Sequence, residues 1–169
     1  MSFRNTSSSV AERISRSGGG VYLYESWATM PLIDPGIFDE FVVPYNRRVI
    51  DYVASRFATP PPAMVMGGNI TRLMEYFLRA NTSLIACDYN ADFDFVKAKT
   101  AGTGIIVRGC VDPKTIERGG WETLQASIDR LAEKARGMVN FIWGCGCVSY
   151  RTPPQSVRRF KQMCAEARV

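Results

Sequence analysis

The chain has 169 residues, of which 46% are hydrophobic and 22% charged, and its formal net charge is +5 at pH 7. This length and balance are typical of a globular domain with a substantial core. No apolar stretch approaches the roughly 20 residues of a membrane helix, and no basic stripe interleaves with aromatics, so we expect neither membrane nor nucleic-acid partners. Histidine is absent, which excludes Ser–His and Cys–His nucleophiles and removes the commonest zinc ligand.

The first part of the chain predicts a leader, a strand and a broken helix. Residues 1–19 are rich in Ser, Arg and Gly and are predicted to be a disordered leader, so that the folded part spans residues 20–169. A β-branched and aromatic run predicts a strand at residues 21–24. Asp34, followed by a proline, is typical of a helix start, and Pro44 should kink or divide that helix.

The rest of the chain alternates short apolar runs with helical patterns. The apolar runs predict strands at residues 63–66, 83–86, 104–108 and 138–143. A helical pattern follows each run, as at residues 92–99 and 121–136. Strand–helix repetition builds a parallel sheet, so we expect the α/β class. Five such units fall short of the eight of a closed TIM barrel, which predicts an open or incomplete barrel.

Each predicted strand is followed by a cluster of small or polar residues. The clusters are Glu25-Ser26-Trp27, Gly67-Gly68-Asn69, Cys87-Asp88-Tyr89, residues 109–112 and residues 144–147. In parallel sheets of this kind, chemistry gathers where the strands end. The clusters are therefore the candidate active site.

Several of these residues suggest contacts with a ligand, and each also has a plainer interpretation. Glu25 and Ser26 have no evident structural duty, so we expect them to face a ligand. Gly68 and Asn69 can offer backbone N–H groups to an anion at a helix start, although a tight turn is the commoner explanation. Arg108 can clamp a carboxylate or phosphate if it faces the ligand, and is only an edge residue if it points outward.

Acidic residues gather after the third predicted strand. Asp88 is adjacent to the strand end and is expected to face the mouth of the barrel. Asp92 and Asp94 are more simply explained as charges that complement the dipole of the next helix. Asp88 is therefore the member of the group that we expect a ligand to reach.

The five cysteines suggest a cellular compartment and a metal site. An odd number of cysteines in an α/β pattern indicates a reducing cytoplasm rather than a disulfide framework. Cys145 and Cys147 are two residues apart, so in extended chain both thiolates can meet one soft metal ion. With Cys87 and Cys110, four sulfurs can converge in the arrangement that suits zinc. The alternative is that these are small buried residues beside glycine-rich turns.

Five motifs occur along the chain in a recognisable order. They are Tyr24-Glu25-Ser26-Trp27-Ala28, Phe41-Val42-Val43-Pro44-Tyr45, Asp88-Tyr89, residues 109–113 and Gly144-Cys145-Gly146. Together they resemble the C-terminal part of the uroporphyrinogen decarboxylase superfamily, which includes uroporphyrinogen decarboxylase and cobalamin-dependent methyltransferases. The resemblance runs from Val21 to the C-terminus and does not include residues 1–19. It implies the last five units of a (β/α)8 barrel.

The resemblance implies roles for individual residues. The implied catalytic residues are Ser26, Asp88 and Cys145. The residues that we predict to bind the substrate, from the resemblance and from the strand-end clusters together, are Glu25, Gly68, Asn69, Tyr89, Arg108 and Asp112. Cys145 stands where the decarboxylases usually have His, and it matches the later zinc-binding Cys of the methyltransferases. Val65 and Gly67 stand at their other two zinc positions and cannot ligate, so the family's zinc site is broken in this sequence. The predicted metal ligands, chosen for their spacing, are Cys145 and Cys147.

We weigh three functions, two implied by the resemblance and a third that follows from the open edges of an incomplete sheet. Methyl transfer to a thiol, on the corrinoid-linked side of the family, is favoured because Cys replaces His, and we expect the isolated fragment to be impaired or inactive. Uroporphyrinogen decarboxylation in porphyrin biosynthesis is one alternative, and a non-enzymatic oligomerising module is another. The expected ligands are a tetrapyrrole or a thiol, with zinc and a corrinoid as cofactors. The expected partners are a corrinoid protein, a second copy of the chain or the missing N-terminal half. The expected location of the protein is the cytoplasm.

Overall fold

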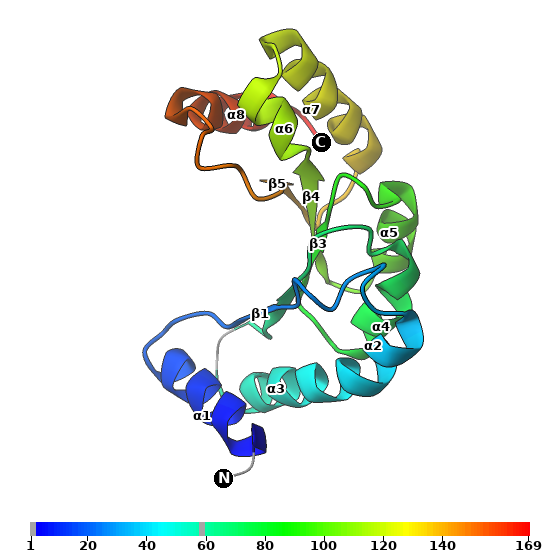
Figure 1. Cartoon of the computed structure of the whole chain (residues 1–169), viewed down its shortest axis with the longest axis vertical. Helices are drawn as coiled ribbons and strands as arrows, with labels where there is room; N and C mark the ends of the chain where they lie inside the picture. Colours follow the sequence, from blue (N-terminus) through cyan, green and yellow to red (C-terminus); the bar gives the residue numbers. More distant parts are fainter. Residues whose placement is uncertain (1–2, 58–59) are drawn as a thin grey trace. The chain divides into compact units, whose positions relative to one another are not determined.

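The computed structural model describes residues 3–57 and 60–169 (Figure 1). These residues include a five-stranded sheet whose strand order follows the chain. β2 pairs in parallel with β1 and with β3, and β4 pairs in parallel with β5. Helices alternate with the strands, which confirms the predicted α/β class. The strands are β1 (Tyr22–Tyr24), β2 (Ala63–Val65), β3 (Leu84–Cys87), β4 (Ile106–Val111) and β5 (Phe141–Cys145).

The chain divides into two compact units, Met1–Ile85 and Ala86–Val169, with the boundary inside β3. The helices of unit 1 are α1 (Phe3–Arg16), α2 (Pro35–Phe41), α3 (Val43–Arg56), the 3-10 turn η1 (Thr71–Leu73) and α4 (Met74–Arg79). The helices of unit 2 are α5 (Phe93–Thr100), α6 (Pro113–Arg118), α7 (Trp121–Ala135) and α8 (Pro154–Glu166). None of the described helices has the length and apolarity that a bilayer crossing requires.

The broken helix of unit 1 follows from local sequence. The Asp34 carboxylate accepts hydrogen bonds from the N–H groups of Gly36 (2.7 Å) and Ile37 (3.0 Å), so that it caps α2. Pro44 lies in the first turn of α3 and has no N–H to continue the earlier helix. The helix therefore divides at Val42, which confirms the predicted break.

The predicted disordered leader differs from the structure, in which most of these residues form α1. Ala11 and Ser15 lie one turn apart and are both buried, and α1 packs against α3. The Tyr52 hydroxyl of α3 donates a 3.0 Å hydrogen bond to the Glu12 carboxylate. The composition did not reveal this helix, because a helix with a narrow packed face needs few apolar residues. Residues 1–2 of the predicted leader lie outside the described residues.

Unit 1 is held together by a buried core and by one buried hydroxyl. Phe38 of α2 and Phe77 of α4 are buried and stack with their ring centroids 5.8 Å apart. The Thr82 hydroxyl accepts a 2.8 Å hydrogen bond from the N–H of Met64 in β2. The same hydroxyl donates a 2.8 Å hydrogen bond to the carbonyl of Leu84 in β3, so that it links the two strands.

In unit 2, strand β4 begins later and extends further than the strand predicted at residues 104–108. Gly109 and Cys110, predicted to follow the strand, pair within it against Trp143 and Gly144 of β5. A Cβ at Gly109 would lie 3.0 Å from the ring of Phe93 in α5. This glycine therefore marks a close approach of an aromatic ring within the strand, whereas the sequence predicted that it follows the strand. β5 likewise begins at residue 141, later than the predicted 138.

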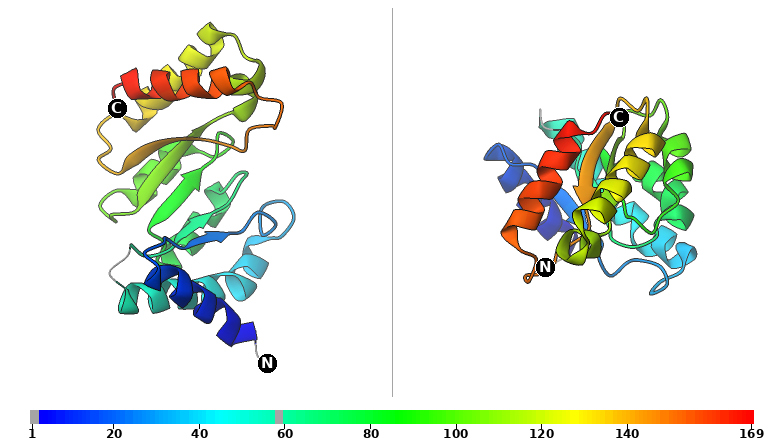
Figure 2. Two further views of the ribbon diagram at one scale, coloured as in Figure 1. Left: turned by 90° about the vertical axis from the view of Figure 1, so that its left-hand side faces the viewer. Right: turned by 90° about the horizontal axis from the view of Figure 1, so that it is seen from above.

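Helices α6, α7 and α8 pack on one another in unit 2 (Figure 2). Their apolar faces enclose a buried cluster with the end of β4. Its members are Val111, Ile116, Leu124, Ile128, Phe160, Met163 and Cys164. Trp143 and Cys145 of β5 pack against this cluster, so the helices cover one face of β4 and β5.

Candidate functional site

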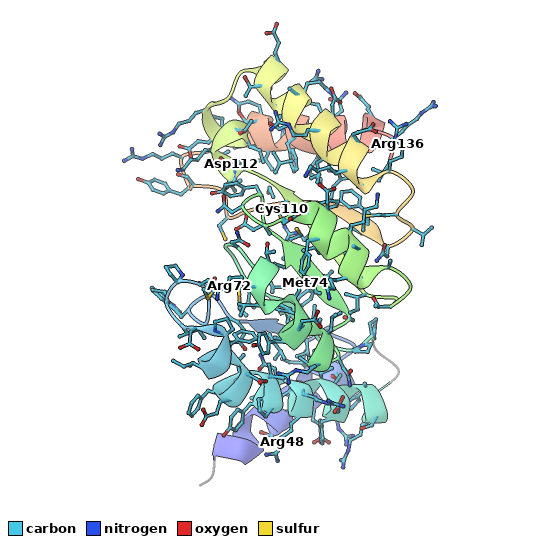
Figure 3. The ribbon with its side chains drawn as sticks, turned by 90° about the vertical axis from the view of Figure 1, so that its right-hand side faces the viewer. Arg48, Arg72, Met74, Cys110, Asp112 and Arg136 are labelled. Carbon is cyan, nitrogen blue, oxygen red and sulfur yellow. The ribbon has the colours of Figure 1, made fainter. Side chains whose placement is uncertain are left out.

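Unit 2 contains a cavity of about 340 Å³ beside the ends of β3 and β4. Asp88 and Tyr89, which follow β3, and Asp112, which follows β4, line it. Cys110 of β4 also lines it, and Figure 3 shows Cys110 and Asp112 at this strand end. The structure thus brings Asp88, Tyr89 and Asp112, three of the predicted site residues, into one space.

The two carboxylates of the cavity are fixed by the backbone that follows them. Asp88 Oδ1 accepts a 2.7 Å hydrogen bond from the N–H of Tyr89. Asp112 Oδ1 accepts a 2.8 Å hydrogen bond from the N–H of Lys114, with Pro113 at the first position of α6. Side chains anchored in this way hold their direction, which a binding site requires.

Helix α7 supplies another part of the cavity wall. Ser127, Arg130, Leu131 and Lys134 recur three and four residues apart, so they share one face of the helix, and all four line the cavity. Lys134 Nζ lies 2.7 Å from Asp94 Oδ2, whereas Arg130 forms no ion pair with any residue that the structure describes. Sequence reasoning missed both cations because charges on an amphipathic helix usually face solvent. Their i, i+4 spacing, beside the half-buried Leu131, is the signal that could have identified them.

The thiols beside the cavity are held in the protonated form. Burial raises the pKa of Cys87 and of Cys110 to about 12, because an ionised sulfur loses its hydration there. Burial also raises the pKa of the half-buried Cys145. Cys147 is exposed. Cys87, Cys110 and Cys145 therefore offer little thiolate at neutral pH.

The predicted zinc ligands do not form a metal cage. Within residues 3–57 and 60–169, no group of three or more His, Cys, Asp or Glu side chains is arranged to hold an ion. Cys145 packs against the apolar cluster beneath α6–α8, and a protonated thiol must lose its proton before it binds zinc. The residues as arranged do not fit the ion. Zinc ligation by Cys145 and Cys147 stays a prediction.

Arg108 lies outside the cavity lining and is held across the neighbouring strand. A Cβ at Gly144 of β5 would lie 2.6 Å from Cγ of Arg108, so the stem of the arginine occupies the space of the missing side chain. Arg108 Nη2 donates a 3.2 Å hydrogen bond to the carbonyl of Cys145. The arginine is half-buried, and its direction is set by β5.

The predicted site residues of unit 1 are engaged in local structure. The Glu25 carboxylate accepts a 2.6 Å hydrogen bond from the side chain of Asn46 in α3, a structural duty that the sequence did not reveal. Ser26 is exposed in the turn after β1. Gly68 has φ +83°, and Asn69 Oδ1 accepts a 3.0 Å hydrogen bond from the N–H two residues on. This geometry favours the tight turn over an anion site, and contact of these residues with a ligand stays a prediction.

Comparisons with known proteins agree with this architecture. The sequence model of one family, described as uroporphyrinogen decarboxylase (URO-D), matches residues 4–167. A uroporphyrinogen decarboxylase from Synechococcus sp. (strain CC9902) is 30% identical over 117 residues, which are 69% of this chain and 32% of that protein. Another, from Pelobacter propionicus, is 23% identical over 154 residues, which are 91% of this chain and 43% of that protein. The chain thus spans less than half the length of these relatives.

A solved structure shares the fold. A methyltransferase from Methanosarcina mazei superposes with a TM-score of 0.77 over 96% of this chain and 47% of that protein, at 18% sequence identity. The family match begins at residue 4, so it includes all of α1 except its first residue, and the sequence resemblance did not extend to this helix. Because the family model matches residues 4–167, which extend through both units, the chain belongs to the uroporphyrinogen decarboxylase family.

Proposed function

We propose that this chain supplies the carboxyl-terminal part of an enzyme that removes carboxyl groups from a tetrapyrrole. The observation that carries the proposal is the cavity of unit 2, in which two carboxylates, Asp88 and Asp112, share one space with two cations, Arg130 and Lys134. Family membership and the name shared by the curated relatives support the substrate class.

Each polar group of the cavity has a counterpart on such a substrate. Pyrrole N–H groups donate hydrogen bonds to carboxylates, so Asp88 and Asp112 are suited to orient the ring. Arg130 and Lys134 are suited to a carboxylate side chain. During decarboxylation the bond between an acetate methylene and its carboxyl carbon breaks and CO2 leaves. The bonding electron pair stays on the methylene carbon, and a proton then completes a methyl group.

The volume of the cavity limits how much substrate unit 2 receives. About 340 Å³ lies at the lower end of the range, roughly 300–1,000 Å³, that is typical of small-molecule sites. We therefore assign to it one pyrrole ring with its carboxylate side chains. Asp88 is the proposed catalytic contact in this space. Ser26 and Cys145, the other predicted catalytic residues, are not among its lining residues.

Methyl transfer to a thiol is the second candidate. Cys145 at the end of β5, with Cys147 two residues on, favours it, and a corrinoid protein would then be the methyl donor. Burial raises the pKa of Cys145, which leaves little thiolate for such a reaction, so decarboxylation is the function that we favour. The methyltransferase of similar structure adds no preference, because at 18% identity the likeness extends to the fold alone.

The test is product analysis with the full chain. Anaerobic incubation with uroporphyrinogen, followed by oxidation and separation of the porphyrins, should give products with fewer carboxyl groups. We expect turnover slower than that of a full-length relative, because the chain covers less than half of one. Asp88→Asn and Arg130→Gln should each lower the rate roughly tenfold or more. Arg136→Gln, an exposed arginine beyond the end of α7, is the matched control.

Fluorescence quenching by uroporphyrin measures binding separately from turnover. If the chain neither binds uroporphyrin nor decarboxylates uroporphyrinogen, the proposal fails. If a thiol removes the methyl group of methylcobalamin in the presence of the chain, the absorbance change of the corrin establishes methyl transfer in its place.

A further inference from the structure

Strand β4 presents Arg108 on the face that the helices leave uncovered. Gly109 lies against Phe93 of α5, and Val111 belongs to the cluster beneath α6–α8, so these two positions face the helices. Side chains alternate along a strand, which places Arg108 on the other face. Ile142, its partner in β5, is 42% exposed. A ligand can therefore approach this face of unit 2.

The guanidinium of Arg108 is held in one direction before any ligand binds. Its stem lies in the space left by Gly144, and one N–H group is bonded to the carbonyl of Cys145. A long side chain loses rotamer entropy when it is fixed, and here the fold has already fixed it. This preorganisation favours tight binding of a ligand that accepts hydrogen bonds from the remaining N–H groups of the guanidinium.

The charge of Arg108 is not neutralised within its unit. A guanidinium carries five N–H donors, and its one hydrogen bond to the described chain is to a neutral carbonyl. No carboxylate in the described part of the chain forms an ion pair with Arg108, although the side chain is half-buried. Partial burial of an unpaired cation costs free energy that an anionic ligand would recover.

We propose that Arg108 binds a carboxylate group of the ligand at the carboxyl ends of β4 and β5, and that Gly144 is its positioning residue. The planar guanidinium matches the two oxygens of a carboxylate, so a bidentate contact is expected. The anion site itself does not depend on the proposed function. The identity of its ligand, a carboxylate side chain of a tetrapyrrole, rests on that function.

Arginine Nε–H signals in ¹H–¹⁵N spectra of the full chain test the anion site directly. The signal of Arg108 is identified by its loss in Arg108→Lys. We expect acetate to shift this signal and acetamide, its neutral counterpart, to leave it in place. Figure 3 labels Arg136 beyond the end of α7, and Arg136→Gln is expected to keep the acetate response of Arg108 unchanged.

Affinity for uroporphyrin, measured by fluorescence quenching, tests the ligand. Arg108→Lys keeps the charge and loses the planar fork, and we expect binding to weaken roughly 10-fold to 100-fold. Gly144→Ala keeps both charge and fork but fills the space of the arginine stem, so it should weaken binding in the same direction. Thermal melting shows whether each variant is folded. A folded Gly144→Ala variant with unchanged affinity and an unchanged Arg108 signal would contradict the positioning role.

The outcomes separate this inference from the proposed function. An Arg108 signal that ignores acetate, or that responds equally to acetamide, overturns the anion site. An acetate response in a chain that does not bind uroporphyrin overturns the tetrapyrrole ligand and leaves the anion site in place. If the wild-type chain and Arg108→Lys turn over uroporphyrinogen equally and the Arg108 signal does not respond to acetate, the role of Arg108 is overturned. The proposed function then stands.

Discussion

The thiol of Cys110 shows how one buried side chain can couple folding to pH. Its pKa rises from 9.0 to about 12 on folding because burial disfavours the thiolate. Between these two pH values the unfolded chain loses the thiol proton while the folded chain keeps it. The folded state therefore binds more protons, and its stability decreases as the pH rises. Below pH 9.0 both states are protonated, and the contribution is fully present.

The first prediction concerns this pH window. The free energy of unfolding of the wild type should fall between pH 9.0 and about 12. The free energy of unfolding of Cys110→Ala should fall less steeply, with a slope that is smaller by up to roughly 1.4 kcal/mol per pH unit. Urea denaturation at a series of pH values measures both slopes. Cys147→Ala, which removes an exposed thiol, is the control and should keep the wild-type slope. Parallel slopes for Cys110→Ala and the wild type would show that the thiol titrates normally.

At the scale of elements, prediction succeeded where the signal is local. Asp34 and Pro44 act within a few residues of their own positions, so the helix start and the break could be predicted from sequence. The register of β4 could not, because it is set by pairing with β5 and by the ring that lies over Gly109. For the same reason Arg130 was missed, since only the packing of α7 shows that its face lines a cavity.

Helix α1 carries the second prediction. Ala11→Asp places a carboxylate at a position that is 3% exposed, and an unpaired buried charge should release α1 from α3. Hydrogen exchange read by mass spectrometry should then show faster exchange in residues 3–16. The matched control is Val10→Asp, at the neighbouring residue, whose own side chain is 50% exposed, and it should leave the exchange slow. Equal exchange in the two variants would contradict the packing of Ala11.

At the scale of the whole molecule, the strand order leaves β1 and β5 at the edges of the described sheet. Tyr22 and Tyr24 of β1 are 55% and 70% exposed and stack on each other. An edge strand with exposed aromatic side chains and unpaired backbone groups is a template for pairing with another chain.

The third prediction is therefore self-association through β1. Sedimentation velocity should show an average mass that increases with protein concentration. Tyr24→Lys should shift the chain toward monomer, because a charge on an edge strand opposes pairing. Tyr150→Lys, at a tyrosine that is 89% exposed in the segment before α8, should not. A single species with the monomer mass at every concentration would exclude self-association.

The pairing of Arg108 with Gly144 has an evolutionary consequence. One position lacks a side chain because the other needs its space, so neither can change freely while its neighbour stays the same. Descendants that keep the arginine are expected to keep the glycine, and lineages that shorten residue 108 become free to enlarge residue 144. The two positions should therefore vary as a pair among homologous sequences, and that joint variation would record which lineages retained the arginine.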